Sequence, residues 1–166
     1  MKLFRARARR HATTRKFDPL DSSGSVAGPR GWRFNELATE ILYTAEVEAL
    51  AILEVAVRPG FETIAEILIA TIEVPDGAIA GLDELGLRLP PDWDVRPAAD
   101  ESRKIARGFL EVLAARPAGS RPVGLRVPSV LSGSDFNVLL DPSRKAEFRA
   151  TQVSRIPFGS LRATGS

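Results

Sequence analysis

The 166-residue sequence has no cysteine and a single histidine, His11. The missing cysteines exclude disulfides, thiolate nucleophiles and Cys-ligated zinc or iron–sulfur centres, and one histidine excludes multi-histidine metal sites and disfavours a Ser-His-Asp triad. No apolar run reaches the roughly 18 residues of a membrane span, and the apolar segment of a signal peptide is also missing. We therefore expect a cytoplasmic protein without membrane contact, whose chemistry uses carboxylates, hydroxyls and arginines and no metal.

The composition is that of a folded chain. Hydrophobic residues make up 44% and charged residues 27% of the sequence, which excludes a disordered chain, and the length suits one domain spanning residues 1–166. The 23 Lys and Arg nearly balance the 21 Asp and Glu. The pI of about 9.4 arises because arginine keeps its charge far above neutral pH, so it is poor evidence for a nucleic-acid partner.

Hydrophobic periodicity predicts an α+β fold with a central apolar helix. Apolar and basic residues alternate over residues 3–9, which favours an edge strand, although the seven Lys and Arg among the first 16 residues also suit a nucleic-acid-binding arm. Further short strands are expected at 41–44, 66–74, 123–127 and 136–140, helices at 47–57 and 101–115 with Asp100 as N-cap, and a short helical or looping connection at 78–87. Such elements suggest two small sheets packed together.

A loop rich in Gly, Ser, Pro and Asp spans residues 18–36 and ends in Trp32, Arg33 and Phe34. Loops with such endings often hold ligands. The Arg33 guanidinium can present a fork to a phosphate or ribose, with aromatic neighbours as stacking surfaces. The pattern alone favours the simpler interpretation of a surface arginine between two core aromatics.

Glu54 is unusual because it lies in a helical stretch, AILEVAV, whose other residues are all apolar. Burying an unpaired carboxylate costs several kcal/mol. Glu54 should therefore either form an ion pair, with Arg126 or Arg58 as candidate partners, or face a cleft. The pattern leaves both alternatives open.

Two hydroxyl-bearing residues lie at strand ends. Ser129 follows Pro128 at the end of a predicted strand, where ligand groups commonly sit, but serine after proline is also ordinary turn chemistry. Without a histidine base nearby Ser129 is not expected to act as a nucleophile, although it can orient another group. Tyr43, the only tyrosine, is either a core residue or a stacking platform.

Five short motifs recur in an order that resembles the RES-domain family, which is named for an Arg, a Glu and a Ser. They are Gly-x-Arg-aromatic-Asn at 31–35, Leu-Tyr-x-Ala-Glu at 42–46, Ala-Leu-Ala-x-Leu-Glu-Val at 49–55, Leu-Arg-Val-Pro-Ser at 125–129 and Phe-Asn-x-Leu-Leu-Asp-Pro at 136–142. The resemblance runs from Leu3 to about Phe158 and matches Arg33, Glu54 and Ser129 to the three residues of the name.

The resemblance implies a fold similar to the ADP-ribosyltransferases and a bacterial toxin that cleaves the nicotinamide–ribose bond of NAD, its substrate. The ADP-ribose would pass to a protein side chain, water or phosphate. The catalytic residues would be Glu54 beneath the ribosyl cation, Arg33 on the pyrophosphate or ribose, and Ser129 orienting Glu54 or the ribose. The residues implied to bind NAD are Arg33, Tyr43 stacked on nicotinamide, Asn35, Arg126 and Asn137.

The same resemblance implies partners. An Xre-type antitoxin, a helix-turn-helix repressor, would cover the active site. A protein target for ADP-ribosylation is implied for some members, and a homodimer is expected. The sequence departs from the family pattern at Phe34, where Trp is commoner, at Arg58, where His is common, and at Pro157 to Arg162, where an aromatic-Asp-Pro-Arg motif is reduced.

Two functions of other classes are alternatives. The basic N-terminus could make the chain a nucleic-acid-binding module, although no helix-turn-helix or RNA-binding signature follows it. The chain could also be a catalytically inactive interaction module, in which Glu54 serves only as a structural ion-pair partner.

Overall fold

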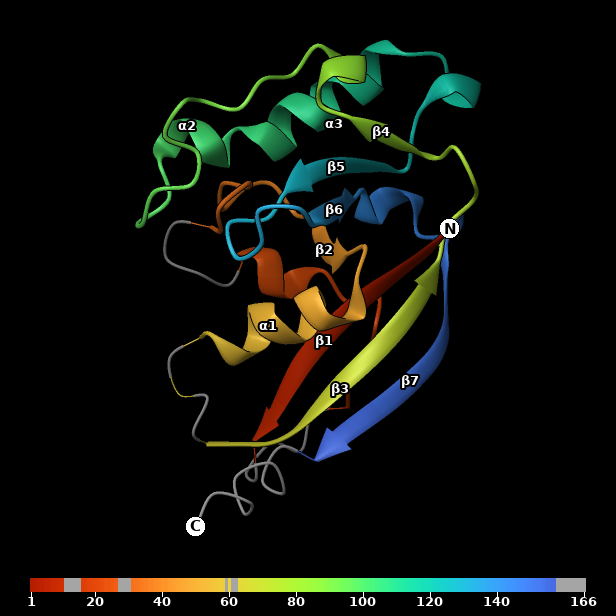
Figure 1. The fold of residues 1–166 in the computed structure, drawn as a ribbon. Helices are drawn as coiled ribbons and strands as arrows, with labels where there is room; N and C mark the ends of the chain where they lie inside the picture. Colours follow the sequence, from red (N-terminus) through yellow and green to blue (C-terminus); the bar gives the residue numbers. More distant parts are fainter. Residues whose placement is uncertain (11–15, 27–30, 59, 61–62, 158–166) are drawn as a thin grey trace.

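The computed structural model describes residues 1–10, 16–26, 31–58, 60 and 63–157 (Figure 1). The strands are β1 (Lys2–Arg10), β2 (Leu42–Ala45), β3 (Ile64–Glu73), β4 (Ile79–Gly81), β5 (Gly124–Pro128), β6 (Phe136–Leu140) and β7 (Arg149–Pro157). The helices are α1 (Glu48–Ala56), α2 (Asp100–Arg103) and α3 (Ile105–Ala115), joined by short 3-10 turns of which η1 (Ser23–Val26) bears on the site. The unusual C-terminal motif from residue 158 onward lies outside the described residues.

All seven strands form one sheet in the order β4-β5-β6-β2-β1-β3-β7. Every neighbouring pair is antiparallel except β4 and β5. The four strands on the β4 side and the three on the β7 side meet at a single rung, where Phe4 lies opposite Ala45. The expectation of two packed sheets is therefore wrong: the two groups of strands are halves of one sheet, joined through this single rung.

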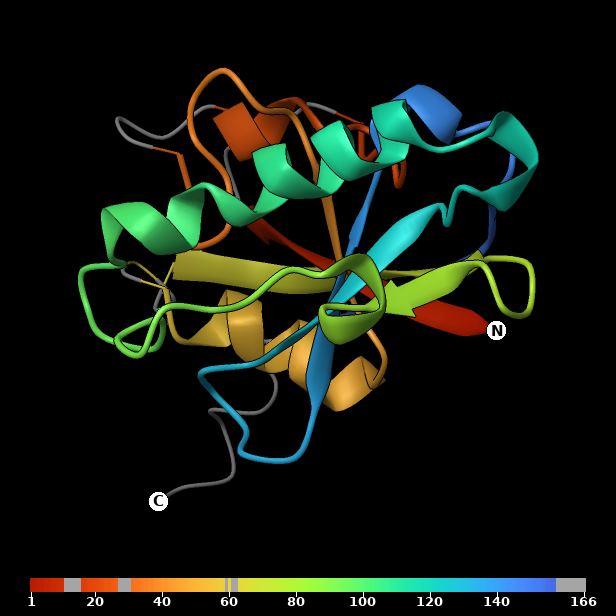
Figure 2. The same cartoon turned by 90° about the horizontal axis from the view of Figure 1, so that it is seen from above.

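Each face of the sheet is covered by a helix, with α3 and α1 on opposite sides (Figure 2). Phe109 and Leu113 of α3 are buried against Leu125 and Leu139 of the β4 side. On the other face, Val55 of α1 packs with Ile67 and Ile69 of β3 and with small side chains of β1. Leu50 and Ala51 of the same helix pack with Ala45 of β2, so α1 lies over the junction of the two halves of the sheet. Burial does not account for every apolar residue of α1, because Leu53 is 38% exposed.

The sequence predicts most of these elements. The helix at 47–57, the strands at 41–44, 66–74, 123–127 and 136–140, and the α+β class are confirmed. The helix at 101–115 is divided into α2 and α3, and Ala99 rather than Asp100 is the residue at its N-cap. Asp100 is instead the first helical residue and forms an ion pair with Arg103.

The strand predictions differ from the structure in three places. β1 is an interior strand rather than an edge strand, because β2 and β3 both pair with it. The connection at 78–87 contains the expected short helical turn, at Asp83–Leu85, but begins with β4, which adds to the sheet edge in parallel with β5. β7 was not expected because its side chains are mostly exposed at the other edge, so it lacks the alternating apolar pattern of a half-buried strand. In the described part of the chain, no helix is long and apolar enough to cross a membrane.

Candidate active site

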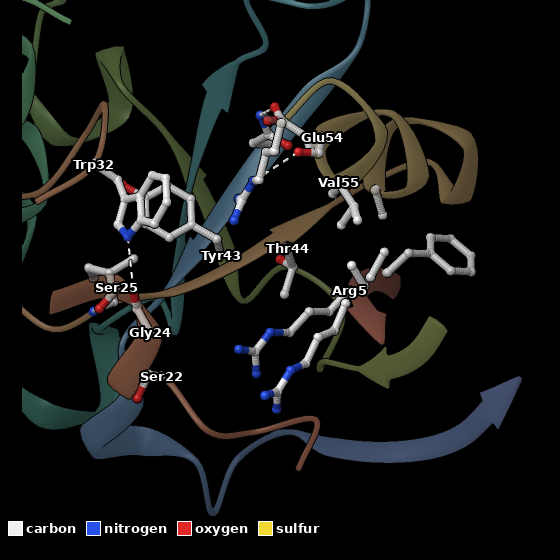
Figure 3. Close-up of a pocket in the computed structure, with 18 of the residues that line it drawn as sticks. Arg5, Ser22, Gly24, Ser25, Trp32, Tyr43, Thr44, Glu54 and Val55 are labelled. Carbon is white, nitrogen blue, oxygen red and sulfur yellow. Dashed lines mark hydrogen bonds between the residues drawn. The ribbon is translucent and has the colours of Figure 1, made fainter. Parts of the chain in front are cut away.

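A pocket of about 580 Å³ opens where β1 and β2 diverge beyond the rung of Phe4 and Ala45. Its walls come from both strands, from the C-terminal half of α1 and from the segment around η1. Figure 3 shows Glu54 on one side of this space, the rings of Trp32 and Tyr43 on a second, and Arg5 across from Glu54. The pocket therefore brings a carboxylate, two aromatic rings and several arginines together.

Glu54 projects from α1 into this pocket, half-buried. The side chain of Asn137, on β6, donates to Glu54 Oε1 over 3.0 Å. Neither predicted ion-pair partner contacts the carboxylate: Arg126 is engaged by Glu46, and Arg58 donates only to the Glu54 backbone carbonyl. Within the described residues, Glu54 thus makes no ion pair and is held by a neutral amide, which leaves its negative charge facing the cavity.

Arg33 reaches the same pocket from a sharply turned segment. Gly31 begins the turn with φ of 76°, and a Cβ on Gly31 would lie 2.1 Å from the carbonyl oxygen of Asn35, so only glycine fits there. Nη1 of Arg33 donates to the carbonyls of Trp93 and Val95 at 2.6 and 3.0 Å. Partial burial lowers the pKa of Arg33, with a smaller lowering from Arg96 and an opposing effect from Glu54.

Tyr43 supplies a ring to the pocket wall, while its hydroxyl is turned away into a buried network. The hydroxyl donates to Asn35 Oδ1 over 2.8 Å and accepts from the backbone N–H of Phe34 over 3.2 Å. Burial raises the pKa of Tyr43 well above its usual value. Tyr43 therefore combines the two roles that the sequence leaves open: its hydroxyl belongs to the core and its ring forms part of the pocket wall.

Asn35 does not line the pocket but is fully buried behind it. Its amide donates to the carbonyls of Ser25, Glu36 and Thr39 at 2.9 to 3.0 Å. Together with the bond from Tyr43, these contacts fasten the segment that carries Arg33 to the strand that carries Tyr43. Asn35 thus positions the wall of the pocket.

Ser129 and Arg126 also lie outside the residues that line the pocket. Ser129 Oγ accepts from the backbone N–H of Leu131 over 3.0 Å, so it shapes the turn that places its neighbour Val130 in the wall. Arg126 forms a two-pronged bond with Glu46 at 2.7 and 2.9 Å and lies 3.4 Å above the ring of Phe136. Of the seven residues that the sequence singles out, the pocket lining unites Arg33, Tyr43, Glu54 and Asn137.

Sequence reasoning missed two arginines of the pocket, Arg5 and Arg7 of β1. Arg5 donates to the carbonyls of Pro19 and Asp21, each over 2.6 Å, and burial lowers its pKa to about 10. The signal was present in the alternation of residues 3–9, which puts these two side chains on one face of a strand. In the structure the segment around η1 lies beside this face, so Arg5 and Arg7 line the pocket together with Asp21 to Ser25.

Trp32 bridges two segments that line the pocket. Its Nε1 donates to the carbonyl of Gly24 over 2.9 Å, and the Arg58 guanidinium lies 4.6 Å from its ring centroid. Because Arg58 extends from the end of α1, these contacts link η1 to α1 over the pocket. In the described segments, no cluster of three His, Cys, Asp or Glu side chains is arranged to hold a metal ion.

Comparison with known proteins identifies one family for this chain. The family model described as RES domain matches residues 2–159. The protein named Toxin Res from Photorhabdus laumondii is 30% identical over 139 residues, which cover 82% of this chain and 83% of that protein. The protein named Prs ADP-ribosylating toxin from a Sphingobium species is 32% identical over 132 residues, 78% of this chain and 77% of that protein. Because the family model matches nearly the whole chain, the chain belongs to the RES domain family.

Proposed function

We propose that this protein is a toxin enzyme that cleaves the nicotinamide–ribose bond of NAD and transfers the ADP-ribosyl group to an acceptor. Membership of the RES family and the name of the Sphingobium relative, an ADP-ribosylating toxin, support the reaction class. The observation that carries the proposal is the pairing of Glu54 with a neutral donor, Asn137, inside a pocket otherwise rich in arginine.

The reaction gives this pairing its importance. Breaking the bond between nicotinamide and ribose develops positive charge on the ribose, and a carboxylate beneath the sugar stabilises that charge. An arginine bound to Glu54 would cancel most of the effect. The Asn137 amide instead fixes one carboxylate oxygen without neutralising it, so the second oxygen can face the ribose and its hydroxyls.

The other pocket residues divide into those that touch NAD and those that hold the walls. Arg33 keeps Nη1 on two backbone carbonyls, and within the described chain its Nη2 and Nε make no hydrogen bond, so they are free for the ribose or diphosphate. The Tyr43 ring offers a stacking surface for nicotinamide. Asn35, Ser129 and Arg126 act as positioning residues, through the hydrogen bonds that fasten their segments.

The acceptor can be water, phosphate or a protein side chain, because all three attack the same ribosyl carbon. A protein acceptor would make the chain an ADP-ribosyltransferase, water a glycohydrolase and phosphate an NAD phosphorylase. The growth-arresting activity would be held in check by an Xre-type antitoxin that occludes the pocket. An arginine-rich cavity suits an antitoxin carboxylate, such as a chain terminus, which would compete with NAD.

The test uses purified protein and NAD labelled in the adenylate half, incubated with and without phosphate and with cell lysate. Labelled ADP-ribose would identify water as the acceptor, its phosphorylated form phosphate, and labelled polypeptide a protein. A Glu54→Gln preparation run in parallel excludes a contaminating activity. A wild-type protein that is folded, free of antitoxin and leaves labelled NAD intact under all three conditions would refute the proposal.

A further inference from the structure

Arg7 differs from the other arginines of the pocket in having no partner. Its guanidinium makes no hydrogen bond or ion pair within the part of the chain that the structure describes, although its side chain lines the cavity. The others are engaged: Arg5 on the carbonyls of Pro19 and Asp21, Arg33 on those of Trp93 and Val95, and Arg58 over the Trp32 ring. The five N–H donors of this half-buried cation thus have no acceptor within the described residues.

The position of Arg7 also concentrates positive charge. Arg5 and Arg7 are alternate residues of one strand and share a face, about 7 Å apart along it, and the proximity of Arg7 contributes to the lowered pKa of Arg5. Asp21 lines the same end of the pocket and interacts electrostatically with Arg5. Asp18 also interacts electrostatically with Arg5 but does not line the pocket. The lining at this end therefore carries two guanidiniums and one carboxylate.

The geometry of the pocket separates this charge from the carboxylate. Figure 3 shows Glu54 and Arg5 on opposite sides of the open space. An anion beside Glu54 would be repelled, whereas at the β1 side it meets two arginines. A substrate with its ribosyl carbon at Glu54 and an anionic group further along would therefore match both ends.

We infer that Arg7 is a phosphate-binding residue of this pocket, whose planar fork of donors holds phosphate oxygens. The inference rests on the proposed function and deepens it. Phosphate geometry matches a guanidinium fork in a way that a chloride or a single carboxylate oxygen does not. The phosphate can belong to the diphosphate of NAD or be free phosphate that serves as acceptor, and the two sources give different results below.

The test measures binding of ADP and of adenosine by calorimetry, which requires no turnover. Arg7→Ala should raise the Kd of ADP by about 10- to 100-fold, as expected for the loss of charged hydrogen bonds, and should leave adenosine binding unchanged. Arg9→Ala is the matched control, because Arg9 pairs with Glu66 over 2.7 Å and does not line the pocket. Arg7→Lys, which keeps the charge and loses the fork, should give an intermediate Kd and serves if the alanine variant does not fold.

The phosphate arm measures NAD turnover as inorganic phosphate is added. If Arg7 holds the acceptor, Arg7→Ala keeps its ADP affinity but loses its response to phosphate. A folded Arg7→Ala variant with wild-type affinity for ADP and a wild-type phosphate response overturns the inference. If ADP binding depends on Arg7 while the wild type leaves NAD intact, the proposed function fails and the phosphate site stands.

Discussion

Replacing Glu54 with Gln tests the proposed chemistry most directly. Glutamine keeps the size of the side chain and an oxygen that can accept from Asn137, so the 3.0 Å bond that orients the group can persist. Only the negative charge is removed. A carboxylate about 4 Å from a full ribosyl charge, at an effective dielectric constant of 20, contributes about 4 kcal/mol.

Because the charge on the ribose is only partly developed in the transition state, we expect a loss of about 3 kcal/mol, or a fall in kcat of more than 100-fold. The KM for NAD should change less than kcat, because in the ground state the positive charge lies on the nicotinamide ring and moves onto the ribose only as the bond breaks. The assay is steady-state release of nicotinamide, with thermal unfolding of each variant measured in parallel.

Glu48→Gln is the matched control, because Glu48 is an exposed residue in the first turn of the same helix. Removing its charge near the helix N-terminus should cost about 0.3–1 kcal/mol of stability and leave turnover unchanged. Glu54→Gln should show the reverse pattern, with stability kept and turnover lost. A folded Glu54→Gln protein with near-normal turnover would refute the role of Glu54.

Three further outcomes are expected. Arg33→Lys should lower kcat/KM for NAD by about 10- to 100-fold, because an ammonium cannot hydrogen-bond the backbone carbonyls and the substrate at the same time. If Arg33→Lys has unchanged kinetics and Arg30→Lys is impaired, Arg30 rather than Arg33 binds NAD. Tyr43→Phe should cost about 1–3 kcal/mol in denaturant unfolding by leaving Asn35 Oδ1 and the Phe34 N–H unpaired, with KM nearly unchanged; an equal stability would contradict the network. The purified antitoxin complex should bind NAD more weakly than the free toxin, and equal affinities would show that the antitoxin acts elsewhere.

The parts of the fold that the sequence predicts are those with a buried, periodic surface. β6 is recognisable because four of its five residues are buried. In α1 only Leu50, Ala51 and Val55 are buried, but its residues from Ala49 onward are apolar apart from Glu54, which stands out as the one charge in that stretch. β7 carries no such signal, since its side chains are mostly exposed and its place depends on pairing with β3. Edge strands specified by a neighbour's backbone cannot be recognised from their own side chains.

The pocket arginines of β1 show a different limit. A period of two assigns Arg5 and Arg7 to one face of a strand, but it does not say whether that face meets water or a cavity. The answer depends on β2, which pairs with β1 at Phe4 and then diverges. That divergence involves residues about 40 positions apart in sequence, and no local pattern reports it.

The sequence also does not show which motif residues bind backbone groups and which bind a ligand. Asn35 and Ser129 can each be singled out by the order of motifs, yet their contacts are with carbonyls and N–H groups whose positions follow from loop geometry. A side chain that hydrogen-bonds a loop and one that binds a ligand use the same donors and acceptors. The sequence therefore finds such residues without distinguishing support from contact.

The divergence of β1 and β2 also accounts for how the two charged ends of the pocket are held apart. Glu54 is fixed by α1, whose Val55 packs against the β1–β3 half, and by Asn137 from the other half of the sheet. Arg5 and Arg7 are fixed by the ladder between β1 and β3. Rigid elements thus set the distance between carboxylate and guanidiniums, while the loops contribute carbonyls that anchor Arg5 and Arg33. Because the opposing charges belong to paired strands and a packed helix, they stay separated without bound substrate. The proposed reaction would require this preorganisation, since a ribosyl cation is too short-lived for the site to rearrange around it.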